Sequence, residues 1–338
     1  MVGGRAVPTR GDGVTRVFAY NGDADGLCAL QQLRLAEGAG ADAVLVTGVK
    51  RDIQLLERVQ ASAGDSCTVL DVSLDVNRAG LLRLLAAGVK VRYFDHHFAG
   101  ELPASPNFEA HIDLAPNVCT SLLVDRALQG RGLRQLSWAI VGAFGDSLTE
   151  EARALSAGAG LSAEDTATLK DLGVAINYNA YGETLADLHV PPAQLAAEML
   201  PYTDPLQFAR GSETYRRLAS GFRDDMEQAR RLEPTRRAAG TIQFMLPDAA
   251  WARRASGTLA NDLAKAHEGN ALAIISPKAE GGFLVSIRVP RDCPTSAESF
   301  CRRFPTGGGR KAAAGINHLP PEQLETFSRA FEEQFRAG

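Results

Sequence analysis

The chain has 338 residues, of which 45% are hydrophobic and 22% charged, and its formal net charge is −4. This length predicts two domains, and the composition is that of a globular protein with a sizeable core. A chain with a net negative charge does not bind nucleic acid over its whole surface, so any nucleic-acid chemistry would depend on a local basic patch. We therefore expect no long nucleic-acid partner.

The cysteines and the hydropathy pattern favour a reducing, aqueous compartment. The five cysteines are widely scattered and form no CxxC pair, which argues against a disulfide framework and against a zinc knuckle. No apolar run reaches the roughly 18 residues of a membrane span, and residues 1–13 lack the apolar stretch of a signal peptide. The sequence thus predicts a cytoplasmic protein without a membrane partner.

The first half of the chain alternates strand and helix patterns. Short apolar runs predict strands at 16–20, 43–48, 67–73 and 89–95. Apolar spacings of three and four predict helices at 27–35, 52–60 and 77–88. Such alternation is typical of a mostly parallel sheet with helices on both faces. The following part, about 118–200, has a largely helical pattern.

A charged, helix-prone segment at 205–240 separates this half from a second strand–helix pattern. There we expect strands at 241–246, 271–276 and 283–289, and helices at 252–267, 296–303 and 320–336. The prediction is an α/β protein with a smaller C-terminal α/β domain across a cleft. Its expected parts are a first domain at 14–200, a helical connector at 201–240 and a C-terminal domain at 241–338.

Carboxylates and imidazoles recur where the predicted strands end. They are Asp23 and Asp25 in DADG, Asp71 in VLDVS, Asp95, His96 and His97 in YFDHH, and Asp146 in AFGDS. Taken singly, each motif is more often a turn, a cap or a structural histidine. The carboxyl ends of parallel strands meet at one sheet edge, however, so these groups should converge there. Oxygen and imidazole donors without thiolates suit Mn²⁺ or Mg²⁺ better than structural zinc.

These four motifs, in this order, resemble those of the DHH phosphoesterase superfamily. TGGGRKAAAG at 306–315 resembles the glycine-rich signature of the DHH-associated C-terminal domain, and the resemblance runs from about Val14 to Phe335. The superfamily includes RecJ-like exonucleases, oligoribonucleases, cyclic-dinucleotide phosphodiesterases and family II pyrophosphatases. The resemblance implies a hydrolase with two Mn²⁺ ions, which would activate a bridging hydroxide for attack on phosphorus.

The resemblance also implies a role for each motif residue. One ion would be held by Asp25, Asp71, His96 and Asp146, and the other by Asp23 and Asp71. His97 would contact the scissile phosphate or assist the leaving oxygen, and Asp95 would orient the histidines. We expect these last two residues to form the catalytic pair.

Three positions depart from the family pattern. Many members carry a histidine where this chain has Ala19, and RecJ-like members carry an aspartate where it has Asn21. The second ion would therefore lack a strong ligand, and millimolar Mn²⁺ would be needed. Arg310 replaces the histidine of the glycine motif, and an arginine still suits a phosphate.

A local basic patch is expected in the C-terminal domain. Its expected substrate-binding residues are Arg288, Gly307, Gly308, Gly309 and Arg310. The glycines would let backbone N–H groups approach a phosphate, as in an anion nest. The alternative is a flexible loop beside a solvated face. The segment NYNAYG at 177–182 is either part of the floor between the domains or a turn.

These observations predict an Mn²⁺-dependent phosphodiesterase that acts on short nucleotides, because a local patch on an acidic protein favours small substrates. Candidates are short oligoribonucleotides, adenosine 3′,5′-bisphosphate, and cyclic dinucleotides such as c-di-GMP with its linear product pGpG. A RecJ-like exonuclease is less favoured, since such enzymes usually carry extra single-strand-binding domains. A non-catalytic nucleotide-binding module with a degraded metal site is the alternative of another class. The oligomeric state, including a homodimer, stays open.

Overall fold

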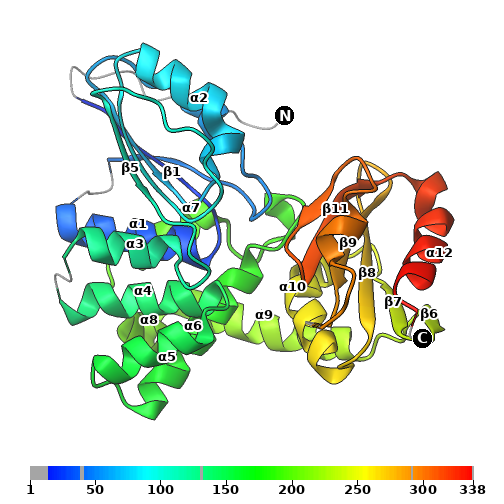
Figure 1. Ribbon diagram of the computed structural model, residues 1–338. Coiled ribbons are helices and arrows are strands. Elements are labelled where there is room, and N and C mark those ends of the chain that lie inside the picture. Colours follow the sequence, from blue (N-terminus) through cyan, green and yellow to red (C-terminus); the bar gives the residue numbers. More distant parts are fainter. Residues whose placement is uncertain (1–13, 39–41, 130–131, 291, 337–338) are drawn as a thin grey trace, which may run out of the picture.

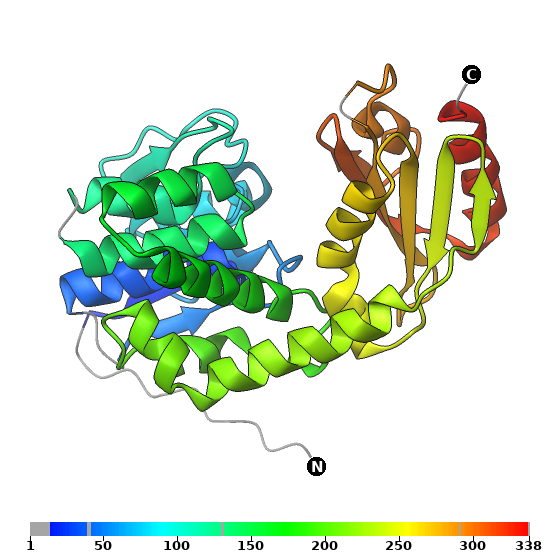
Figure 2. The ribbon, with the colours of Figure 1, turned by 90° about the horizontal axis from the view of Figure 1, so that it is seen from below.

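The computed structural model describes residues 14–38, 42–129, 132–290 and 292–336. It forms two lobes, each built around one sheet, and the helix α9 (Glu213–Arg230) runs from one lobe to the other (Figure 1, Figure 2). Among these residues, no helix is long and apolar enough to cross a membrane.

The N-terminal lobe contains a fully parallel sheet in the order β2-β1-β3-β4-β5. Its strands are β1 (Arg16–Tyr20), β2 (Val44–Val46), β3 (Ser66–Leu70), β4 (Lys90–Asp95) and β5 (Phe108–Ile112). The predicted parallel sheet is confirmed. The edge strand β5 was not predicted, because its sequence FEAHI is polar and only partly buried and so lacks an apolar run.

Helices cover both faces of this sheet, as predicted. The helix α2 (Leu74–Ala86) packs on the face of Val17 and Ala19. The opposite face, with Phe18 and Tyr20, contacts α1 (Ala24–Glu37) and the helices behind it (Figure 1). Those are α3 (Thr120–Ala127), α4 (Leu133–Gly145), α5 (Thr149–Gly158), α6 (Ala163–Asn179), α7 (Pro192–Met199) and α8 (Pro205–Gly211).

The prediction of a helix at 52–60 is wrong, because this segment contains only the 3₁₀ turn η1 (Leu55–Arg58). Side chains of α2 bond the backbone groups that a longer helix would have used. The amide of Leu56 donates to Asn77 Oδ1 (3.0 Å), and Arg83 Nη2 donates to the carbonyl of Leu56 (2.7 Å). The turn is therefore stabilised by tertiary hydrogen bonds.

The C-terminal lobe contains a mixed six-stranded sheet in the order β10-β11-β9-β8-β7-β6. Its strands are β6 (Arg236–Ala238), β7 (Thr241–Met245), β8 (Ala271–Pro277), β9 (Phe283–Arg288), β10 (Gly307–Gly309) and β11 (Ala313–Leu319). One face packs on α9 and α10 (Ala250–Ala266), the other on α11 (Ala297–Cys301) and α12 (Leu324–Gln334). The second α/β unit is thus present. Its strand β6 lies inside the expected connector, and the domain boundaries stay predictions.

A buried ion pair lies where the connecting helix meets both lobes. Arg254 of α10 donates through Nε to Asp225 Oδ2 of α9 (2.8 Å) and to the hydroxyl oxygen of Tyr178 of α6 (3.1 Å). The Tyr178 hydroxyl itself donates to Asp225. Beside them, Arg253 Nη2 pairs with Asp187 Oδ1 (2.7 Å) of the 3₁₀ turn η2 (Leu185–Asp187). These bonds fix the orientation of the two lobes.

Candidate metal centre

The YNGDADG turn joins β1 to α1 and places two aspartates at the carboxyl edge of the sheet. Asp23 is the N-cap of α1, and its Oδ1 accepts hydrogen bonds from the amides of Asp25 (3.0 Å) and Gly26 (3.2 Å). A Cβ at Gly26 would lie 2.2 Å from the carbonyl oxygen of Asn21, so the turn requires glycine there. The carboxylate of Asp23 thus has one oxygen committed to the helix terminus.

Asp25 points toward the start of α3 rather than along its own helix. Its Oδ2 accepts from the amide of Thr120 (2.7 Å) and its Oδ1 from the amide of Ser121 (2.8 Å). The residue is 1% exposed. Both oxygens therefore satisfy amides at a helix N-terminus, which stabilises a buried carboxylate. A role for Asp25 as a metal ligand stays a prediction.

Asp71 follows β3 and lies between the other acids. Its backbone has φ 61°, a left-handed conformation that is rare for a residue with a side chain. Its Oδ1 accepts from the Thr120 hydroxyl (3.1 Å). Burial and then the carboxylates of Asp23 and Asp25 raise the pKa of Asp71 well above its usual value. Such a buried carboxylate cluster requires a nearby positive charge.

His96 faces this cluster. Its Nδ1 lies 2.9 Å from the carbonyl oxygen of Val118 and donates to it, so Nε2 is directed to the acids. Nε2 is 3.4 Å from Asp71 Oδ1 and 3.9 Å from Asp146 Oδ2, at the end of α4. Burial opposes protonation, but the Asp71 carboxylate raises the pKa of His96 to about 10. Burial and the Asp25 carboxylate raise the pKa of Asp146 to about 6.

His97 lies beside His96 and is oriented by Asp95. Its Nδ1 is 2.7 Å from Asp95 Oδ1, and Asp95 is fully buried at the end of β4. Asp71, His96 and His97 each offer a ligand atom within 4.8 Å of the others. The donor set, of carboxylate oxygen and imidazole nitrogen, fits Mn²⁺. The structure therefore brings these three residues and Asp146 to one place.

Lys50 is a charged residue of this centre that the sequence reasoning missed. It lies in the loop after β2, forms an ion pair with Asp23 and donates to Asn177 Oδ1 (3.0 Å). Burial works to lower the pKa of Lys50, but the Asp23 carboxylate raises it well above its usual value. The available signal was its position after a strand of the same parallel sheet, where ligands gather.

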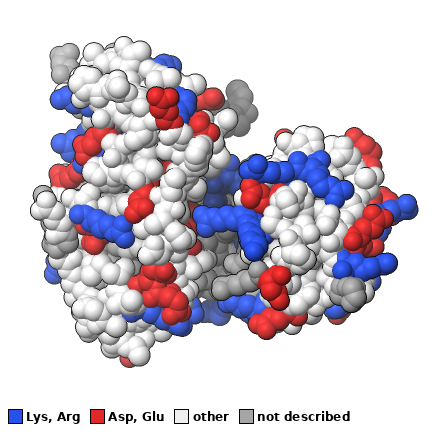
Figure 3. All heavy atoms as spheres, in the orientation of Figure 1, with Lys and Arg blue, Asp and Glu red and all other residues white. Residues whose placement is uncertain are grey.

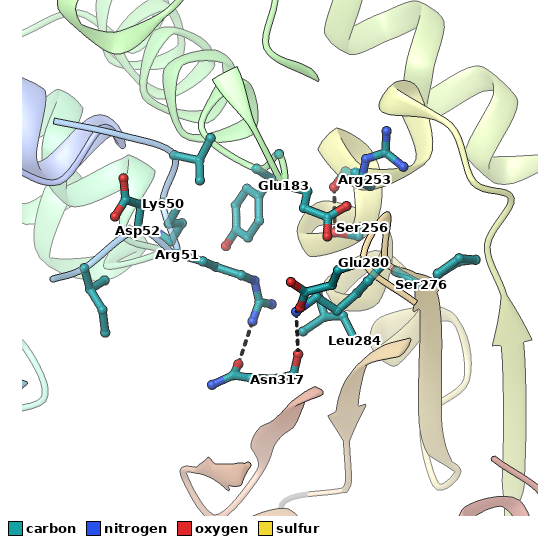
Figure 4. Close-up of a pocket in the computed structure, with 16 residues that line it drawn as sticks. Lys50, Arg51, Asp52, Glu183, Arg253, Ser256, Ser276, Glu280, Leu284 and Asn317 are labelled. Atoms are coloured by element: carbon teal, nitrogen blue, oxygen red, sulfur yellow. Dashed lines mark hydrogen bonds and ion pairs between the residues drawn. The ribbon is translucent and has the colours of Figure 1, made fainter. Parts of the chain in front are cut away.

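A cavity of about 700 Å³ adjoins the centre and lies between the lobes (Figure 4). The N-terminal lobe contributes residues 49–53 and 181–183, and the C-terminal lobe contributes Arg253, Ser256 and 276–278 among others. Arg51 Nη1 donates across the cavity to Asn317 Oδ1 (3.2 Å). Lys50 belongs both to this lining and to the acid cluster.

The expected substrate-binding residues lie on or just after β9 and β10, the two strands that flank β11 in the C-terminal sheet. Arg288 ends β9 and donates to Asn261 Oδ1 (3.1 Å), and Arg310 is exposed just after β10. The glycines form the edge strand β10, and their role in phosphate binding stays a prediction. A Cβ at Gly307 would lie 1.7 Å from the carbonyl oxygen of Cys301, so packing alone explains that glycine. Figure 3 shows Lys and Arg side chains where the lobes face each other.

No protein-family model matches the sequence, and no curated protein matches it. Solved structures do match the fold. RecJ from Thermus thermophilus, in complex with Mn²⁺, has a TM-score of 0.64 at 22% identity, over 94% of this chain and 51% of that one. The chain thus spans about half the length of that protein. Exonuclease RecJ bound to manganese has a TM-score of 0.62 at 20% identity, over 96% of this chain and 91% of that chain.

A third structure is the DHH domain of a member of a family of ribosomal proteins. Its TM-score is 0.65 at 14% identity, over 96% of this chain and 88% of that chain. Identities this low are evidence for the fold and not for an activity. At 94% to 96% coverage of this chain, all three likenesses extend over both lobes. The chain has the two-lobed fold of these three structures, the third of which is a DHH domain.

Proposed function

We propose that the protein is a metal-dependent phosphodiesterase that cleaves short nucleotides. The observation that carries the proposal is the position of His96, whose Nε2 lies between the carboxylates of Asp71 and Asp146 at 3.4 Å and 3.9 Å. These three residues would hold an Mn²⁺ ion, which would lower the pKa of a bound water and offset charge on phosphate oxygens. The manganese in both RecJ structures supports this ion.

The neighbouring side chains suit the remaining parts of such a reaction. His97 is 41% exposed and is held through Nδ1 by Asp95, so its Nε2 is free to give a proton to a leaving oxygen. Arg51 and Lys278 line the cavity and suit phosphate oxygens. Tyr181, also in the lining, offers a ring on which a base can stack.

The cavity favours a short substrate. Its volume of about 700 Å³ lies within the ordinary range for small-molecule sites. Its walls come from both lobes, which are also joined beside it by the amide of Ala279 donating to Glu183 Oε2 (3.0 Å). A pGpG-like dinucleotide, a cyclic dinucleotide or a short oligoribonucleotide fits this description. A RecJ-like exonuclease is the second candidate, because the fold of two RecJ structures extends over both lobes.

The test is a hydrolysis panel with Mn²⁺. The substrates are pGpG, c-di-GMP, a five-nucleotide RNA, adenosine 3′,5′-bisphosphate and a long single-stranded DNA. We expect turnover of a short substrate, and at least a hundredfold loss in His96→Ala but not in the matched control His267→Ala, at the end of α10. Turnover of the long DNA alone would favour the exonuclease. Binding without any turnover would favour a nucleotide-binding module.

A further inference from the structure

Both oxygens of the Asp23 carboxylate are bonded in this structure. Oδ1 accepts two backbone amides at the start of α1, and Oδ2 is paired with the Lys50 ammonium. The Asp23 side chain is 3% exposed and that of Lys50 is 23% exposed. A buried carboxylate with both oxygens bonded is already neutralised, so it attracts a further cation weakly.

Lys50 is held at this place by its own backbone and by its side chain. Its amide donates to the carbonyl of Ala180 (2.9 Å), and its Nζ donates to Asn177 Oδ1 (3.0 Å). Nζ also lies 5.4 Å from the centre of the Tyr181 ring. The ammonium is therefore anchored from the end of α6 and the turn after it, and is not a mobile surface lysine.

Apart from Asp71, the positions that precede Asp23 add little for a divalent ion. Ala19 has no donor atom, and Asn21 donates through Nδ2 to the carbonyl of Lys50 (3.4 Å). The buried Oδ1 of Asn21 is without a hydrogen-bond partner, but it is a neutral ligand. The positive charge beside Asp23 thus comes from the chain itself.

We propose that the Lys50 ammonium replaces the second divalent ion, so that the centre holds one ion at Asp71, His96 and Asp146 and one fixed cation at Asp23. The proposal rests on the metal site of the proposed function. A fixed ammonium repels a second divalent ion at the shared carboxylate Asp71. Because Lys50 also lines the cavity, it can bind a substrate phosphate oxygen as a point charge.

The experiment measures Mn²⁺ stoichiometry by isothermal titration calorimetry and by metal analysis after dialysis. We expect one ion in the wild type and in Lys50→Arg, and two in Lys50→Met, which removes the charge and keeps the stem. The matched control is Lys90→Met, which replaces an exposed lysine at the other end of the sheet and should bind one Mn²⁺ ion. Asp23→Asn combined with Lys50→Met should return the stoichiometry to one.

Two results would overturn the proposal while leaving the metal site intact. They are two ions in the wild type, or one ion in a folded Lys50→Met protein. No Mn²⁺ binding in the wild type would instead overturn the metal site, and the proposal with it. Wild-type crystals give a measurement independent of any variant. We expect one anomalous peak at the manganese edge, beside His96, and a second peak between Asp23 and Asp71 would contradict the assignment.

Discussion

The ion pair between the lobes allows a quantitative prediction for Arg254→Met. The side chains of Arg254 and Asp225 are only 10% and 6% exposed, and Arg254 Nε lies 2.8 Å from Asp225 Oδ2. Methionine keeps most of the arginine stem, so the substitution mainly removes the charge and its hydrogen bonds. Asp225 would then be a buried carboxylate without its cation.

Removal of one partner from a buried ion pair typically costs roughly 3–5 kcal/mol. Here the Tyr178 hydroxyl still donates to Asp225, and His189 Nε2 lies 3.9 Å from the same oxygen. Both contacts reduce the cost, so we expect a loss of about 3 kcal/mol in the free energy of unfolding. Replacement of both partners should be milder, because no charge is then left unpaired.

The assay is urea unfolding followed by circular dichroism. The control is Arg230→Met. Arg230 is 65% exposed and lies on α9, as Asp225 does, so its replacement should lower the free energy of unfolding by at most about 0.5 kcal/mol. The double variant Asp225→Asn/Arg254→Met should be more stable than Arg254→Met alone. If the free energy of unfolding of Arg254→Met is within about 1 kcal/mol of that of the control, the ion pair does not hold the lobes together.

Two further predictions concern acid stability and substrate binding. Burial works to raise the pKa of Asp225, but hydrogen bonds from His189, Arg254 and Tyr178 lower it overall. The Asp225 carboxylate therefore contributes stability above the pKa of the unfolded chain, about 3.9, and this contribution disappears as the pH falls through the lower pKa of the folded protein. The stability difference between wild type and Asp225→Asn should thus shrink from pH 7 to acid in urea titrations, and a constant difference would contradict this. Arg51→Ala should raise KM roughly tenfold with kcat nearly unchanged, since the Arg51 side chain lines the cavity and donates to Asn317 rather than to a residue of the metal centre; an equal fall in kcat would refute that role.

The sequence by itself determined the architecture of the N-terminal lobe and the place of its acids. Apolar strands that alternate with helices are typical of a parallel sheet that is buried on both faces. The carboxyl ends of such strands share one edge, so Asp71 and His96 had to lie near each other. Local patterns were sufficient for β1 to β4, because each of these strands carries its own apolar run, but not for the polar edge strand β5.

The tertiary structure decided the features that depend on partners distant in the chain. The segment 52–60 is not a helix because side chains of α2 bond its backbone, and the glycines at 307–309 form a strand because β11 pairs with them. The pairing of Lys50 with Asp23 joins two loops that only the sheet brings together. No periodicity encodes such contacts, since each depends on where another element packs. The charge balance of the centre, and with it the number of ions that it can hold, is therefore a property of the folded chain.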